Sequence, residues 1–184
     1  MPFFKSLPEN AGPGNVFSAR PEIYRYWAEM GQALINGPSP ISPAEREMIQ
    51  AYVAGLVECR YAHVAHIAAA AARGIDKALF PKLLDSIETA PIADKWKPLL
   101  AFIRKLTLTP TKVTQADADA VFAAGWDENT LHDAIAVTAR MIFMTRIIHG
   151  HGFTPMSPER AKASAEHRAK VGYVDLYPGL GDKR

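Results

Sequence analysis

The stretch EMIQAYVAGLVECRYAHVAH, residues Glu47 to His66, is the part of the sequence around which the fold is organised. It begins with a carboxylate and holds the only cysteine, Cys59, together with His63 and His66. On an α-helix, positions seven apart lie near one face and positions four apart are neighbours, so both histidines lie close to the face of Cys59. Ala62 lies between Cys59 and His66 on that face. Because thiols, imidazoles and carboxylates carry out nucleophilic, redox and metal chemistry, this stretch is the first candidate for a functional site.

A helix break inside this stretch decides whether its reactive side chains can meet. Ser42 before Pro43, with Glu45 three residues beyond the serine, is a strong helix start, and we expect a helix from there to about residue 57. Gly55 allows a break before a second helix, which should begin near Cys59 and end at residues 73–74. Glu47 and Cys59 are twelve positions apart and would point in different directions on one straight helix. The chain must therefore bend between them if they act together.

The remaining segments also carry helical patterns, and none shows the alternation of a β-strand. Residues 1–20 are rich in Pro, Gly and Asn and are expected to form an irregular lead-in. The segment 127–152 is the longest and most apolar, which is typical of a central, buried helix. Residues 172–184 are expected to form a tail that packs on a partner or stays loose. The prediction is an all-α, single-domain bundle of seven or eight helices, with further helices at 21–36, 76–88, 96–109, 114–125 and 157–171.

Composition excludes several classes of protein. The 184 residues are 48% hydrophobic and 22% charged with a formal net charge of +2, which fits one globular domain. No basic run is interleaved with aromatic residues, so we expect no nucleic-acid partner. No stretch approaches the roughly 18 apolar residues of a membrane span, and no signal peptide is evident. A lone cysteine cannot form an internal disulfide and suits a reducing cytoplasm, which is the predicted location.

The spacing of Glu47, Cys59 and His66 resembles the alkylhydroperoxidase D-like, carboxymuconolactone decarboxylase-like family, in its peroxidase-related branch. In that family the pattern reads Glu, twelve residues to Cys, then Cys-x-x-Cys-x-x-x-His. The surroundings agree, with SPAEREMI before the motif, then LLAFIRKLTLTPTKVT and GWDENTLHDAIAVTARMIFMTR. The resemblance covers roughly residues 15–152. It differs at Ala62, which replaces the second cysteine of the motif.

The resemblance implies a helical bundle that assembles as a trimer or hexamer, with a dimer as the other possibility. It also implies a peroxide-reducing dithiol and a proton relay that uses the glutamate and the histidine. On this chain the relay positions are Glu47 and His66. Without a cysteine at position 62 the dithiol cycle is lost, so the implied activity is a single-cysteine, peroxiredoxin-like peroxidase recycled by an external thiol.

Distances along the helix refine this hypothesis. Seven residues of helix rise about 10.5 Å, too far for His66 to take a proton directly from Cys59. His63, one turn away, is the histidine that could pair with the thiol. The candidate catalytic residues are therefore Cys59 as nucleophile, His63 or His66 as base, and Glu47 to orient the base.

Other interpretations stay open. The same scaffold could be a His/Glu acid–base enzyme of the lactone-decarboxylase kind, acting on a small carboxylated compound, or a non-catalytic oligomeric binding protein. Cys59 could also be an inert core thiol, and His66 a core histidine. A metal site built from Cys59, His63, His66 and Glu47 is a further reading, but three ligands along one helix span too much length for a compact site. We therefore expect a small-molecule substrate, a peroxide or a small organic acid, and no cofactor or metal.

Overall fold

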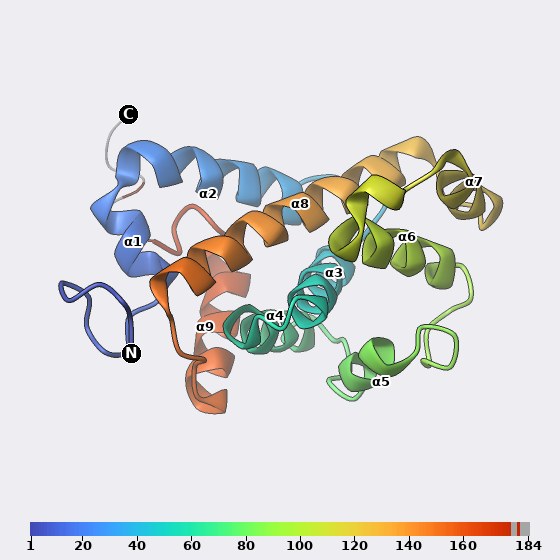
Figure 1. The fold of residues 1–184 in the computed structure, drawn as a ribbon. Coiled ribbons are helices and arrows are strands. Elements are labelled where there is room, and N and C mark those ends of the chain that lie inside the picture. The colour runs from blue at the N-terminus through green and yellow to red at the C-terminus, as the bar shows by residue number, and fades with distance from the viewer. Residues whose placement is uncertain (178–179, 181–184) are drawn as a thin grey trace.

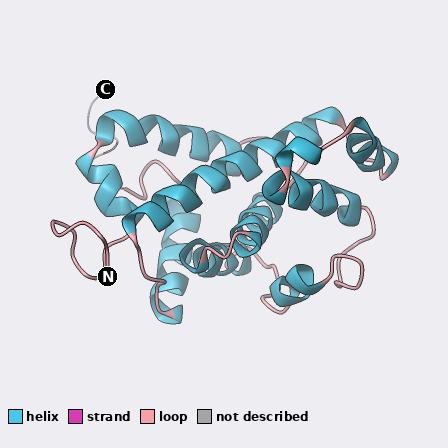
Figure 2. Cartoon of the chain, in the orientation of Figure 1, coloured by secondary structure: helices cyan, strands magenta, loops and turns pink. Residues whose placement is uncertain are grey.

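The computed structural model describes residues 1–177 and residue 180, and in this part of the chain it contains helices and loops but no strand (Figure 2). The expected all-α, single-domain fold is confirmed, with nine α-helices in the described part rather than seven or eight. A single turn of 3₁₀-helix, η1, follows the sixth of them. In chain order the elements are α1 (Pro13–Ala19), α2 (Pro21–Asn36), α3 (Pro43–Leu56), α4 (Arg60–Ala71), α5 (Leu79–Asp85), α6 (Trp96–Leu108), η1 (Pro110–Lys112), α7 (Gln115–Ala123), α8 (Glu128–His151) and α9 (Pro158–Val171).

The long helix α8 runs through the middle of the bundle, with α2 beside it and α3 crossing it (Figure 1). Its inward face is buried, as the apolar sequence predicts, and includes Val137, Met141 and Ile148. Helix α4 packs against α3 on one side and α9 on the other. None of the described helices is long and apolar enough to cross a membrane.

Capping hydrogen bonds form at the predicted starts of two helices. Ser42 accepts from the backbone N–H of Glu45, and the Glu45 carboxylate accepts from the N–H of Ser42, which closes the capping box of α3. Asp127 caps α8 by accepting from the N–H of Thr130. These caps satisfy backbone donors that have no partner within the first helical turn.

The predicted break between the two motif helices lies at Glu58. This residue has φ +56°, the only positive φ among the described residues other than glycine, and Cys59 follows it as the N-cap of α4. The N–H of Cys59 donates to the carbonyl of Ala54, 2.9 Å away, which closes the turn. As a result α4 runs back along α3, and residues near the start of α3 meet residues well into α4.

Two expectations about the ends of the chain were wrong. The lead-in is not wholly irregular, because Pro13 starts the short helix α1, which packs on α2. The described part of the tail, residues 172–177, is neither loose nor packed on another chain. It folds onto α2 and the centre of its own chain, where Tyr173 is 1% exposed. The rest of the expected tail, apart from residue 180, lies outside the described residues.

Candidate functional site

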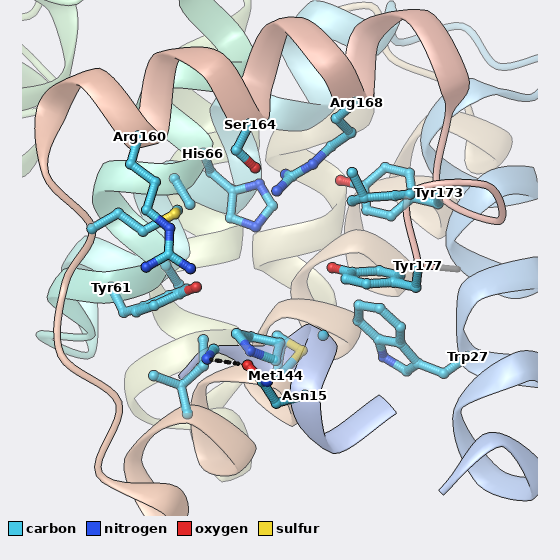
Figure 3. A pocket seen from close by; sticks show the side chains of 18 of the residues that line it. Asn15, Trp27, Tyr61, His66, Met144, Arg160, Ser164, Arg168, Tyr173 and Tyr177 are labelled. Carbon is cyan, nitrogen blue, oxygen red and sulfur yellow. Dashed lines mark hydrogen bonds between the residues drawn. The ribbon is translucent and has the colours of Figure 1, made fainter. Parts of the chain in front are cut away.

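A cavity of about 470 Å³ lies between α1, α4, α8, α9 and the segment that follows α9. Figure 3 shows His66, Ser164 and Arg168 at one side of it, with the rings of Trp27 and Tyr177 across from them. Its size suits a small organic molecule.

Only some of the residues at the start of α4 and within it line this cavity. Ala62 and His66 line it, whereas Cys59 does not and is 0% exposed. The position at which the resemblance places a second cysteine therefore faces the cavity, but as a methyl group. The thiol that the chain retains lies in the core.

His66 and Glu47 form a buried pair across the α3–α4 contact. His66 Nδ1 lies 2.6 Å from Glu47 Oε2, and the side chains are 8% and 0% exposed. The bend at Glu58 produces this pairing because it turns α4 back along α3. Since an ionised carboxylate only accepts, Nδ1–H of His66 donates to Glu47, and Nε2 carries the lone pair. Nε2 has no hydrogen-bond partner among the described residues, and the ring borders the cavity.

Charge and burial set the protonation states of this pair. Burial by itself would raise the pKa of Glu47, but His66, Arg168 and Arg73 lower that pKa to about 2. Burial lowers the pKa of His66 and outweighs the attraction of Glu47, with Arg168 and Arg140 acting in the same direction. At neutral pH the pair is therefore a carboxylate and a neutral imidazole, which is the state of a general base.

A hydrogen-bond network extends from this pair to other parts of the chain. Tyr173 Oη lies 2.9 Å from Glu47 Oε1, and Gln50 Nε2 lies 3.1 Å from Glu47 Oε2 and 3.3 Å from Tyr173 Oη. Arg140 Nη1 donates to Gln50 Oε1 at 2.7 Å. Helices α3, α4 and α8 and the C-terminal segment thus all contribute to one buried cluster.

The cavity is lined by positive charge. Arg140, Arg160 and Arg168 border it, and no acidic residue is among the described residues that line it. Arg140 and Arg168 are 3% and 7% exposed, and each has two buried nitrogens with no hydrogen-bond partner in the described part of the chain. Three arginines and no carboxylate on the described lining make the cavity electropositive, which favours an anionic ligand.

Arg140 is held by stacking. Its guanidinium carbon lies 3.9 Å from the ring centroid of Trp27 and 4.6 Å from that of Tyr173. On α2, Gly31 lies against the same guanidinium, where a side chain would collide with it. The cation is thus fixed between two aromatic rings and a glycine.

The structure places His63 away from the cavity. Its Nδ1 lies 2.8 Å from the carbonyl oxygen of Ala51, and its ring packs edge-on against Phe80. The imidazole donates to that carbonyl and thereby ties α4 to α3. The arrangement is that of a structural histidine.

Cys59 lies at the N-terminus of α4, as predicted, but in an apolar setting. Burial raises the pKa of its thiol, against smaller opposing effects of the Ala62 backbone and Arg146. A helix N-terminus favours a thiolate, but here burial outweighs that effect, because a thiolate loses more from leaving water than it gains from one helix end. Its role as nucleophile stays a prediction that this geometry does not favour.

Several members of the site were not identified from the sequence. Arg140 lies within the apolar run of α8. A charged residue in such a run needs a buried partner, so the sequence could have identified it as a candidate. Tyr173 and Arg168 belong to segments whose sequences look polar and ordinary. No group of three or more His, Cys, Asp or Glu side chains in the described part of the chain is arranged to hold a metal.

Comparison with known proteins agrees with this picture of the scaffold. Residues 21–79, from the start of α2 to the start of α5, match the model of the carboxymuconolactone decarboxylase family. This segment includes Glu47, Cys59 and His66. No curated protein matches the chain.

Two solved structures share the fold. The alkylhydroperoxidase AhpD core, an uncharacterised peroxidase-related protein from Ralstonia eutropha, is 22% identical, with a TM-score of 0.73 over 82% of this chain and 78% of that one. An uncharacterised peroxidase-related protein from a Silicibacter species is 24% identical, with a TM-score of 0.68 over 83% of this chain and 91% of that one. The resemblance to the alkylhydroperoxidase D-like, carboxymuconolactone decarboxylase-like family is confirmed.

Proposed function

We propose that this protein is a proton-transfer enzyme in which His66 is the base and Glu47 its partner, and that its substrate is a small organic carboxylate. The observation that carries the proposal is the neutral His66 imidazole, hydrogen-bonded to Glu47 at 2.6 Å, on the wall of a cavity that also holds two buried arginines. This is the acid–base alternative raised by the sequence.

The reaction follows from the groups present. His66 Nε2 takes a proton from a carbon next to a carbonyl, and the electron pair of the broken C–H bond moves into the carbonyl to give an enolate. Glu47 stabilises the imidazolium that forms, and the arginines stabilise the anionic substrate. The imidazolium then returns the proton to carbon. In a β-keto carboxylate the C–C bond to the carboxylate breaks instead, its electron pair forms the enolate, and CO₂ leaves. His66, neutral at rest, then takes up one proton from solvent and passes it to the enolate carbon.

The single-cysteine peroxidase is the competing activity. It gains support from the peroxidase-related structures of the same fold. It would require a peroxide to reach Cys59, which is fully buried and separate from the cavity. For this reason we place the chemistry at His66 rather than at the thiol.

The test is solvent exchange in D₂O, followed by proton NMR, on a panel of small carboxylated lactones and β-keto acids. The proposal expects deuterium incorporation or CO₂ release that His66→Gln reduces by at least about 100-fold, the usual contribution of a general base. Cys59→Ser should retain the activity. Consumption of organic hydroperoxides that depends on Cys59 and on an added dithiol would instead establish the peroxidase. Binding of carboxylates without turnover would establish a binding protein.

The expected partners other than substrate stay predictions. Homo-oligomerisation as a trimer, hexamer or dimer, and a cytoplasmic location, are carried by the sequence resemblance and the composition. An external thiol reductant is required only by the peroxidase alternative.

A further inference from the structure

Tyr173 lies outside the segment that matches the family and reaches the centre of the site from the far end of the chain. It follows α9, and its backbone N–H donates to Gln32 Oε1 on α2 at 2.7 Å. The preceding Gly172, with φ +76°, lets the chain turn there. The side chain is 1% exposed and its hydroxyl lies 2.9 Å from Glu47 Oε1.

The direction of every hydrogen bond in this cluster follows from Arg140, which has no acceptor atom. Arg140 donates to Gln50 Oε1, so Gln50 presents its NH₂ group to Glu47 and to the Tyr173 hydroxyl. Because the tyrosine oxygen accepts from Gln50, its one proton is free for Glu47 Oε1. Glu47 is thus fixed by donors on both oxygens, and Oε2 is left in line with His66.

From this geometry we propose that Tyr173 is a positioning residue. Together with Gln50 it holds Glu47 so that His66 carries its proton on Nδ1 and presents an unprotonated Nε2 to the cavity. The inference rests on the proposed function only for its catalytic consequence, since the tautomer of His66 is a property of the resting protein. The C-terminal segment is on this view part of the proton-transfer machinery.

Other charged and titratable groups also face His66 and must be separated from the effect of Tyr173. Their positions differ: Glu47 lies on α3, Arg73 in the turn after α4 and 3.8 Å from Glu47, Arg140 on α8, Arg168 on α9, and Tyr177 on the C-terminal segment. Tyr177 provides the matched control. It lines the same cavity from the same segment, packs edge-on against Phe17, and has no hydrogen bond to Glu47 among the described residues.

The experiment is ¹⁵N NMR of the full chain labelled at histidine, with the His66 signal assigned by its loss in His66→Gln. In the unaltered protein, Nδ1 should show the shift of a protonated nitrogen and Nε2 that of an unprotonated one. Tyr173→Phe removes one hydrogen-bond donor from Glu47. The carboxylate then attracts a protonated His66 more strongly. The midpoint of His66 titration should therefore rise by about one pH unit, the scale of a lost hydrogen bond to a charged group. Tyr177→Phe should leave it unchanged.

A proton on Nε2 of the unaltered protein would overturn the proposal without any variant having to fold. So would an unchanged midpoint in Tyr173→Phe, or an equal change in Tyr177→Phe. If exchange activity is found, the acidic limb of its pH profile should move with the NMR midpoint. If the tautomer and the selective shift are observed but no carboxylate is turned over, the positioning role stands and the proposed activity falls.

Discussion

Glu47 and Tyr173 stand 126 positions apart in the chain, yet the tyrosine hydroxyl lies 2.9 Å from the carboxylate, in a core that solvent does not reach. One belongs to the segment that carries the family match and the other does not. The carboxylate that orients His66 is therefore itself oriented by a residue from the end of the chain.

Acid should destabilise the protein in two steps. Burial lowers the pKa of His66 in the folded state, so the imidazole takes its proton more readily when unfolded, and folding stability is full only above about pH 6.5. The pKa of Glu47 is lowered to about 2. Its contribution to the free energy of unfolding is therefore complete above about pH 4.3 and is lost as the pH falls toward 2. Urea unfolding across pH 3 to 8 should show the free energy of unfolding falling below about pH 6.5. His66→Gln should remove the first step and diminish the second, because His66 contributes most to the lowered pKa of Glu47. A first step that persists in this variant would contradict the assignment.

Cys59 should resist peroxide in the folded protein. Because its thiol is buried and its pKa is raised, hydrogen peroxide at neutral pH should leave no sulfenic acid that dimedone can trap, as read by mass spectrometry. Ala62→Cys places a second thiol on the cavity wall, and this one should be trapped. Urea-unfolded protein serves as the control in which Cys59 reacts. Dimedone labelling of folded, unaltered protein would restore the peroxidase hypothesis.

Arg168 should determine affinity for carboxylates. Arg168 lines the cavity beside His66, so Arg168→Gln removes a cation that the ligand would use. Loss of one charge-assisted hydrogen bond weakens binding by about 10- to 100-fold. Calorimetric titration with benzoate measures this change. Lys162→Gln, an exposed site on the same helix away from the cavity, should bind as the unaltered protein does, and equal losses in both variants would refute a specific anion site.

Gly31→Ala should cost about 1 to 3 kcal/mol of stability, because the added methyl group would collide with the Arg140 guanidinium held between Trp27 and Tyr173. Gly150→Ala is the matched control. It lies in α8 with open space at its Cβ, so the higher helix propensity of alanine should stabilise the protein by about 0.5 to 1 kcal/mol. Thermal and urea unfolding give both values. A neutral Gly31→Ala would mean that Arg140 is not held as tightly as its contacts indicate.

Much of the fold could be predicted because its signals are local. The capping residues Ser42 and Asp127 start α3 and α8 as expected, and the apolar run of α8 makes it the central helix. The bend before α4 was also predicted, from Gly55 and the position of Cys59, although the strained residue is Glu58. Helix α1 was missed because its seven residues, PGNVFSA, are too few to give a periodic pattern.

The sequence by itself determined which residue types this protein has available for chemistry: one thiol, an alanine in place of a second, and a glutamate and histidine on either side of a helix break. Only the tertiary structure decided which of them share a site. The turn at Glu58 returns α4 along α3, so His66 meets Glu47, while Cys59, at the apex of that turn, is buried. Spacing along one helix fixes which face a side chain occupies. Whether that face meets a cavity, a carboxylate or the core depends on helices α8 and α9 and on Tyr173, which are brought there by packing from distant parts of the chain.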